Sequence, residues 1–204
     1  MKNIIPVIML IFLCSCGTGA IYVAKNEAES FKNIYEDAQV QKLSKENEAL
    51  LKGIYQRLVR SNVDIYKEGI GITLLKSDKN EKLHYIMVNV RPSELAFNES
   101  TTTPEQRFSY VLQNSFPRYL KFVKKEDLNH DDIEGIALGV YWPVRDFSQC
   151  DTFGGFIEYI HIYVTKEDVF DLIDNKKNFV DVIQSSEVIT SLNLKPAQNV
   201  RPVF

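Results

Sequence analysis

The chain has 204 residues, a formal net charge of −3, and 45% hydrophobic and 25% charged residues. This composition is ordinary for a globular protein and excludes intrinsic disorder as a description of the whole chain. The length suits one domain with a short appendage. The charge balance lacks the basic excess that is typical of nucleic-acid binding, so we expect no nucleic-acid partner.

The first residues follow the order of features that a secretory signal requires. Lys2 supplies a positive charge, an apolar run covers residues 4–13, and small residues begin at Ser15. A charged start, an apolar core and a small-residue end define a signal peptide that is removed on export. We therefore predict that residues 1–15 are a signal peptide.

The stretch Leu13-Cys14-Ser15-Cys16 resembles the lipobox of bacterial lipoprotein precursors. In that pattern a Leu stands three residues before the modified cysteine and a small residue stands directly before it, so Leu13 and Ser15 match for Cys16. Modification of Cys14 fits worse, because the bulky Leu13 would then precede the cleaved bond. The resemblance covers only the first sixteen residues, and we recognise no domain family behind it.

The resemblance implies a diacylglyceryl thioether on Cys16, usually with a third acyl chain on the new amino terminus. Two or more acyl chains hold a protein stably at a bilayer, whereas one chain holds it only marginally. Cys16 is thus the expected lipidation site, followed by a linker over residues 16–24, and the lipid bilayer of the cell envelope is the expected partner. Gly17 replaces the Asp of an inner-membrane retention signal, which favours the outer membrane in a Gram-negative cell.

Two other interpretations of the N-terminus stay open. Residues 4–24 are uncharged and about 20 residues long, enough for an uncleaved membrane-spanning helix, although Pro6 suits such a helix poorly. Ordinary signal cleavage after Ala20 is the second alternative. Cleavage before Cys16 would leave Cys150 without an internal disulfide partner, as an odd thiol in an oxidising compartment.

Residues 25–62 are predicted to form a long N-terminal helix. The segment has no proline and is rich in Glu, Lys, Ala, Gln and Leu. Its apolar residues recur at helical spacing with charges between them, as in Leu43, Leu50, Ile54 and Leu58. This pattern predicts one buried face. Ser44 is able to cap a restart, so a break near Lys42 stays open, and the first half is a candidate stalk.

Residues 63–204 are predicted to form one α+β domain. Residues 69–77 and 82–90 read as two strands around a turn. A polar loop over residues 93–103 follows. Thr103-Pro104-Glu105-Gln106 then predicts a helix start, with a Thr cap, Pro at the first position and Gln able to close a capping box. Pro117 is expected to kink or end that helix.

The second half repeats this order of elements. Residues 135–142 and 156–164 read as another strand pair, joined by a loop that is long for a hairpin. Thr165 is expected to cap a helix with Asp168 at its third position. A short helix over 178–184 and a last strand over 188–194 follow.

Strand pair, helix, strand pair, helix is an order typical of the α+β class. We predict an antiparallel sheet of about four to five strands with helices packed on one face, preceded by the long N-terminal helix.

The residue types of common catalytic and metal sites form no convincing pattern. The chain has three histidines, and no two of them have the spacing of zinc ligands. Residues 127–132 superficially resemble the start of a calcium-binding EF-hand loop, but Asp132 and Leu138 stand where Gly and Glu are needed. Cys150 lacks a surrounding motif, and Asp151 disfavours its thiolate. We therefore predict no catalytic residue, metal or cofactor.

Aromatic residues in the strand over 156–164 are the best candidate for binding. Alternation places Tyr159, His161 and Tyr163 on the face opposite Ile160 and its neighbours, and Tyr141 of the preceding strand can join them. A tyrosine combines a large apolar ring with a hydroxyl, which suits a surface that is wet when free and buried when bound. The alternative is that these rings line the rim of an ordinary core.

Two function classes follow from these observations. The favoured one is a membrane-anchored lipoprotein that serves as a non-enzymatic envelope binding or assembly module, with an envelope protein or a cell-wall component as partner. The alternative is an envelope hydrolase whose catalytic residues are scattered along the sequence. An exposed aromatic sheet face would favour the first, and a cleft that joins Cys150 to a histidine would favour the second.

Overall fold

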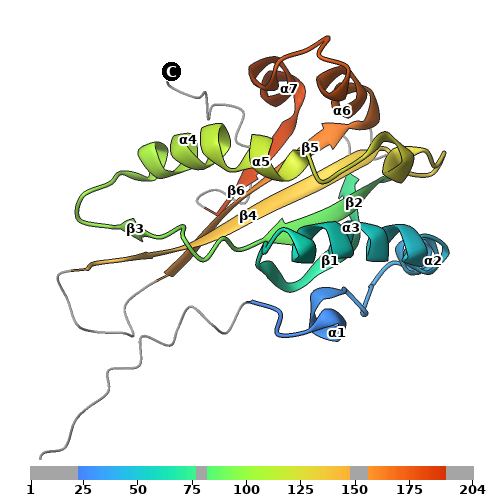
Figure 1. Ribbon diagram of the computed structural model, residues 1–204, viewed down its shortest axis with the longest axis horizontal. Coiled ribbons are helices and arrows are strands. Elements are labelled where there is room, and N and C mark those ends of the chain that lie inside the picture. Colours follow the sequence, from blue (N-terminus) through green and yellow to red (C-terminus); the bar gives the residue numbers. More distant parts are fainter. Residues whose placement is uncertain (1–22, 77–81, 148–155, 192–204) are drawn as a thin grey trace, which may run out of the picture.

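The computed structural model describes residues 23–76, 82–147 and 156–191 (Figure 1). The predicted signal peptide, the lipobox with Cys14 and Cys16, and the loop with Cys150 lie outside the described residues.

In the described part of the chain, six strands form one mixed sheet. The main path runs in the order β1 (Ile65–Lys76), β2 (Lys82–Val90), β4 (Gly135–Arg145), β5 (Phe156–Thr165) and β6 (Glu187–Thr190), and the short β3 (Phe97–Asn98) pairs with β4. The β1/β2, β4/β5 and β5/β6 pairs are antiparallel, whereas β2/β4 and β3/β4 are parallel. The α+β class is confirmed (Figure 1).

The prediction of a wholly antiparallel sheet of four to five strands is wrong. The two predicted hairpins are present as β1/β2 and β4/β5. Between them the chain passes through helices, and a parallel pair of strands requires a crossover connection of this kind. The sixth strand, β3, forms within the segment predicted as a polar loop.

The described helices lie before the first strand and between later strands. They are α1 (Glu27–Ser30), α2 (Ala38–Glu46), α3 (Glu48–Arg60), α4 (Pro104–Asn114), α5 (Phe116–Leu120), the 3₁₀ helix η2 (Lys125–Leu128), α6 (Lys166–Ile173) and α7 (Phe179–Ser185).

The predicted helix starts in the second half of the chain are confirmed. The Thr103 hydroxyl accepts from Gln106 N at 3.3 Å, and the Gln106 side chain accepts from Thr103 N at 2.9 Å, which closes the capping box. Thr165 caps α6 by accepting from Asp168 N at 3.2 Å. α4 ends before Ser115, and Pro117 lies in the first turn of α5, where its missing N–H costs no hydrogen bond.

The prediction of one long N-terminal helix is wrong, because the chain breaks it twice. Asp37 begins α2 as a cap whose carboxylate accepts from Gln39 N at 2.8 Å and Val40 N at 3.2 Å. Asn47 then separates α2 from α3, and its side-chain amide donates to Leu43 O at 2.9 Å. Such a local bond competes with the helical backbone pattern, so the second break falls at Asn47 rather than near Lys42.

Residues 23–35 cover the outer edge of β1, which requires extended backbone rather than helix. Ala24 N donates to Ile65 O at 2.9 Å, and Lys32 N donates to Ile70 O at 2.8 Å. An uncovered edge strand would present unpaired N–H and C=O groups to other chains. This segment therefore protects the sheet, with α1 as a short excursion between its two contacts.

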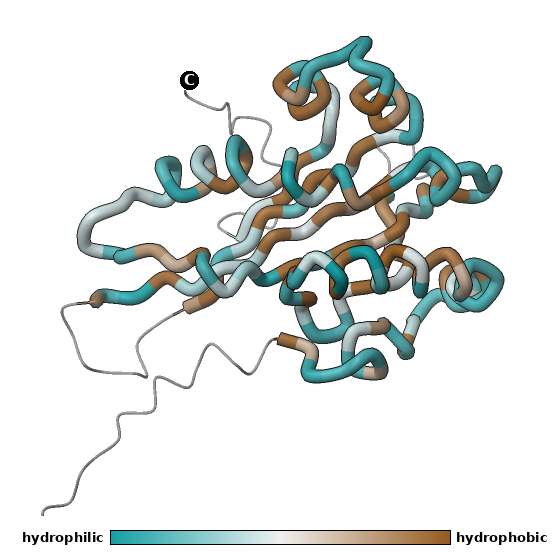
Figure 2. The backbone as a smooth tube through the Cα atoms, in the orientation of Figure 1, coloured by the Kyte–Doolittle hydropathy of each residue, from teal (hydrophilic) through white to brown (hydrophobic). Residues whose placement is uncertain are grey.

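One buried apolar cluster joins the helices to one face of the sheet. It contains alternate residues of the strands, such as Ile72, Ile86, Leu138 and Ile162, together with residues from α2 to α7. Val40 and Leu43 of α2 belong to the same cluster, and Phe31 and Tyr35 pack against it, so the first half of the N-terminal segment is not a separate stalk. Figure 2 shows this pattern as brown strands beneath teal outer turns.

A buried ion pair lies within this core. Arg107 of α4 donates to Glu158 of β5 through Nε at 2.8 Å and Nη2 at 2.6 Å, and Trp142 Nε1 donates to the same carboxylate at 2.9 Å. The two charged side chains are 3% and 2% exposed. Bidentate geometry and a third donor satisfy the carboxylate, so the pair fixes α4 against β4 and β5.

Removing one partner of this pair is expected to be costly. Glu158→Gln leaves the Arg107 charge buried without a counter-charge, and we expect the free energy of unfolding to fall by about 3–5 kcal/mol. Glu94→Gln is the matched control, because Glu94 forms an exposed pair with Arg118 at 2.7 Å and its loss is expected to cost about 1 kcal/mol or less. Equal losses for both variants in chemical denaturation would contradict the structural role of Glu158.

Candidate functional site

The structure brings the four predicted binding residues together on the second face of the sheet. In the β4/β5 register, Tyr141 lies opposite Tyr159, Gly139 lies opposite His161, and Ala137 lies opposite Tyr163. The alternation predicted from the sequence is therefore correct, since these side chains point away from the face that carries Ile160 and Ile162.

Four of the side chains on this face form a connected aromatic cluster, which we define as Tyr66, Tyr141, Tyr159 and His161. The Tyr141 hydroxyl is 2.8 Å from His161 Nε2. Ring centroids are 5.3 Å apart for Tyr141 and Tyr159, and 5.2 Å apart for Tyr159 and His161. Tyr66 stacks on Tyr141 at 4.0 Å with an interplanar angle of 20°. All four residues are partly exposed.

Sequence reasoning missed Tyr66 because it started the first strand at residue 69, whereas β1 begins at Ile65. The register of β1 on β2 shifts between Ile65 and Ile70, and this bulge interrupts the alternation that a strand pattern needs. A strand start at the apolar Ile65 was the signal in the sequence that would have placed Tyr66 in the first strand.

Tyr163 differs from the other three predicted residues, because it is only 8% exposed. Its ring packs edge-to-face on Tyr85 with centroids 5.3 Å apart, and both contact a small apolar group that includes Ala137 and Ile189. Burial raises the pKa of Tyr85 to about 12 and raises that of Tyr163. The expectation of an exposed stripe is thus corrected for Tyr163, which belongs to a second, smaller core.

His161 and Tyr141 of the aromatic cluster are uncharged near neutral pH. Burial lowers the pKa of His161 to about 4, so its imidazole is neutral at pH 7. Burial also raises the pKa of the Tyr141 hydroxyl well above its usual value. The hydrogen bond between these two groups therefore joins two neutral partners, and the cluster offers stacking surfaces and hydroxyl groups rather than a charge.

Gly139 makes room for this arrangement. A Cβ at this position would lie 2.2 Å from Asn89 Oδ1 and 2.7 Å from His161 Nε2, so a larger residue would displace both side chains. Asn89 is consequently a neighbour of the aromatic cluster, although sequence reasoning did not single it out. It lies on β2, directly beside Gly139 in the parallel register.

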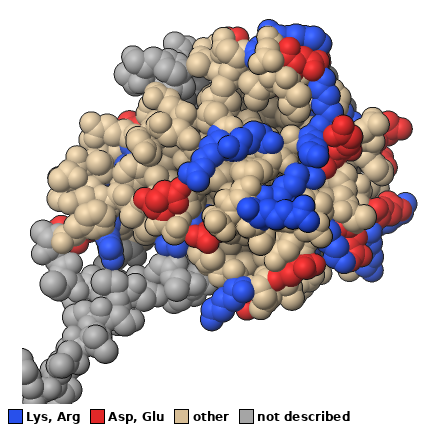
Figure 3. Space-filling model, viewed as in Figure 1, with Lys and Arg blue, Asp and Glu red and all other residues tan. Residues whose placement is uncertain are grey.

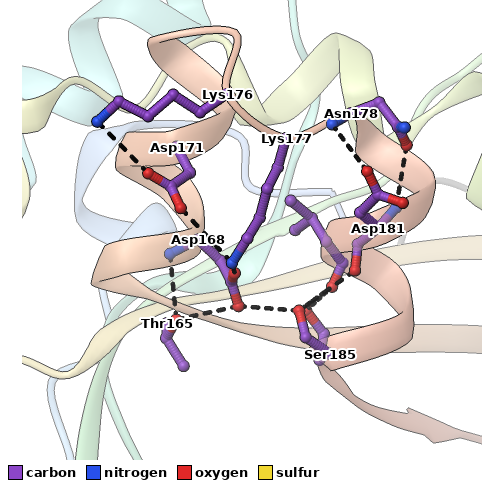
Figure 4. A network of polar contacts seen from close by, with 10 residues as sticks. Thr165, Asp168, Asp171, Lys176, Lys177, Asn178, Asp181 and Ser185 are labelled. Atoms are coloured by element: carbon purple, nitrogen blue, oxygen red, sulfur yellow. Dashed lines mark hydrogen bonds and ion pairs between the residues drawn. The ribbon is translucent and has the colours of Figure 1, made fainter.

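Charged residues of the helix layer hold helices together. Burial raises the pKa of Asp168, but hydrogen bonds from Lys177, Ser185 and Thr165 outweigh this effect and hold it below its usual value. This network ties α6 to α7 (Figure 4).

Figure 3 shows Lys and Arg side chains gathered on the face of the molecule that it presents, with acidic side chains beside several of them.

The segment that resembles a calcium loop has a structural role. The Asp127 carboxylate pairs with Arg57 and accepts from Lys124 N at 2.8 Å, so it is already engaged. Within residues 23–76, 82–147 and 156–191, no three His, Cys, Asp or Glu residues are grouped so that they could hold a metal ion.

Comparison of the chain with models of protein families, with curated proteins and with solved structures finds no match. No described helix has the length and apolar character needed to cross a membrane.

The pKa of His161 predicts a pH dependence of stability. The unfolded state takes up a proton near pH 6.5 while the folded state resists it down to about pH 4, so stability falls as the pH is lowered through this range. We expect wild type to lose about 3 kcal/mol between pH 7 and pH 4 relative to His161→Gln, measured by denaturation. Parallel pH profiles for the two proteins would show that His161 is not held neutral.

The two tyrosines of β5 are expected to respond differently to truncation. Tyr163→Ser opens a cavity under Tyr85, and we expect a loss of about 3 kcal/mol in unfolding free energy. Tyr159→Ser removes only ring contacts of a partly exposed residue and should cost about 1.5 kcal/mol or less. Thermal and chemical denaturation measure both losses. A larger loss for Tyr159→Ser than for Tyr163→Ser would contradict the assignment of Tyr163 to a buried core and of Tyr159 to the partly exposed cluster.

Proposed function

We propose that this protein is a lipid-anchored protein of the cell envelope that acts as a non-enzymatic binding or assembly module. The stretch Leu13-Cys14-Ser15-Cys16 behind an apolar run carries the proposal. Acyl chains on Cys16 would supply stable attachment to the bilayer, with the outer membrane favoured in a Gram-negative cell.

The aromatic cluster supports the binding part of the proposal. Its tyrosines are partly exposed and held in place by stacking and by the Tyr141–His161 hydrogen bond. Rings with fixed orientations lose little conformational entropy when a partner covers them, which favours their use in recognition. A cell-wall component or an envelope protein is the partner that fits this location.

The first described residue, Val23, lies beside the aromatic cluster, which relates the proposed anchor to this surface. Val23 forms a bridge with Tyr66, a member of the aromatic cluster. Seven residue steps separate Cys16 from Val23, and an extended chain spans at most about 3.5 Å per step, or about 25 Å. A lipid on Cys16 would therefore keep the aromatic cluster close to the bilayer.

The described side chains form no grouping that favours the hydrolase alternative. His161 bonds to Tyr141, and the buried carboxylates of Glu158 and Asp168 are engaged in ion pairs. We therefore propose only the binding module.

The anchor is tested by metabolic labelling with a fatty acid in a bacterial host. We expect Cys16→Ala to abolish incorporation of the label, because it removes the thiol that forms the thioether. Cys14→Ala is the matched control and should retain the label, since Cys14 leaves with the signal peptide. Labelled Cys16→Ala protein would refute lipidation at this residue.

A further inference from the structure

Exposed aromatic side chains gather at one end of the sheet, where β4 ends and β5 begins. Tyr110 of α4 is 51% exposed, and Phe147, two residues beyond β4, is 52% exposed. Phe156, the first residue of β5, is 42% exposed. Single exposed apolar residues are ordinary, but several large ones at one place mark a surface that a partner covers.

The strand register aligns the apolar residues at this end. Val144 of β4 pairs with Phe97 of β3 on one side and with Phe156 of β5 on the other. Paired residues project from the same face of a sheet, so the two rings flank Val144, which is fully buried. The Phe97 ring lies edge-to-face on Tyr110, with centroids 5.7 Å apart. We define the strand-end patch as Phe97, Tyr110 and Phe156 around Val144, together with Phe147.

The strand-end patch lies on a part of the sheet that projects beyond β1 and β2. Pairing of β2 with β4 ends at Val90–Val140, whereas β4 and β5 stay paired as far as Val144–Phe156. The four residue steps from Val140 to Val144 are about 13 Å long at about 3.3 Å per residue. Figure 1 shows these two strands extending to the left of the others. The patch is therefore at an extremity of the molecule, where a broad, flat partner can reach it.

An arginine borders the patch. Arg145, the last residue of β4, is exposed, and its guanidinium lies 5.1 Å from the centroid of the Phe147 ring. An arginine can keep its apolar stem against lipid while its charge reaches a headgroup. Glu99 N donates to Arg145 O at 3.1 Å, so an acidic residue lies beside this arginine and the patch has no excess of positive charge. Apolar contact, rather than attraction to anionic lipid, would hold such a surface at a membrane.

The chain before Val23 argues for the bilayer as the partner. Val23 pairs with Tyr66, whose ring stacks on Tyr141 with centroids 4.0 Å apart. Tyr141 lies three residues before Val144 on β4, a distance of about 10 Å. Cys16 can lie up to about 25 Å from Val23. An acylated Cys16 can therefore reach the bilayer while the patch touches the surface of the same bilayer.

We propose that the strand-end patch rests on the bilayer that holds the lipid anchor, with Tyr110, Phe147 and Phe156 in the interfacial region. This inference rests on the proposed function, because the acylated Cys16 brings the patch to the membrane. Aromatic rings are enriched at the boundary between acyl chains and headgroups. The patch is a second attachment point besides the acyl chains, so it restricts rotation of the domain and keeps the aromatic cluster at a constant distance from the membrane.

Tryptophan substitution tests this contact in the full-length protein. The chain has one tryptophan, Trp142, which is fully buried and gives a constant background. Phe147→Trp and Phe156→Trp each add a reporter to the patch, and each keeps an aromatic ring at an exposed position. The protein is bound to phosphatidylcholine vesicles with brominated acyl chains, because bromine quenches tryptophan only at short range. We expect the emission of the added tryptophan to fall about twofold relative to unbrominated vesicles.

Ile34→Trp and Ile173→Trp are the matched controls. Both residues are exposed, and they lie between α1 and α2 and in the last turn of α6, elements that Figure 1 shows to the right of the patch. Bromine should quench these variants no more than wild type. Quenching in the patch that does not exceed the controls would overturn the proposal. Self-association in detergent that Phe156→Ser abolishes, without quenching, would also overturn it, because a second copy of the chain would then cover the patch.

Fatty-acid labelling of the same protein separates the two possible failures. Labelled protein without quenching in the patch would refute the membrane contact and leave the anchor standing. Unlabelled protein that does not float with the vesicles would refute the anchor and the contact together. Unlabelled protein that floats and is quenched in the patch would support the contact and refute lipidation at Cys16.

Discussion

The parallel pairing of β2 with β4 is the contact on which the rest of the structure depends. It runs from Tyr85–Gly135 to Val90–Val140 and joins two hairpins that are each antiparallel within themselves. A two-stranded hairpin is marginally stable alone, and pairing of two hairpins into a wider sheet creates a face large enough to cover with helices. The crossover through α4 and α5 that produces this pairing also positions Arg107 above Glu158.

The two faces of the sheet differ in how much of their apolar surface is buried. Helices cover the face that carries Ile86, Leu138 and Ile162, and this side contains the large core with Trp142 fully buried. The other face has a small apolar group around Tyr85 and Tyr163 and, further along the strands, the partly exposed aromatic cluster. Tyrosines tolerate this intermediate environment, because the ring is apolar while the hydroxyl can remain hydrated or bonded.

Local features were predictable from the sequence, and long-range pairings were not. Thr103 and Thr165 cap helices with partners three residues away, and alternation along β5 correctly placed Tyr159 and His161 on one face. The parallel pairing of β2 with β4 joins segments about fifty residues apart, and no local pattern specifies it. Asn47 ends α2 through a hydrogen bond of its own side chain to Leu43 O, which no residue pattern in the sequence specifies.

The covered edge of β1 determines how the molecule would respond to mechanical load. Any tension carried by the chain before Val23 reaches the fold at the Val23–Tyr66 bridge and then at the Lys32–Ile70 hydrogen bond. These contacts are spaced along one strand edge, so a pull would open them one after another rather than together. Tyr66 would be the first residue of the sheet to feel the force, and its stacking on Tyr141 would transmit the disturbance to the aromatic cluster before the helix-covered core is affected.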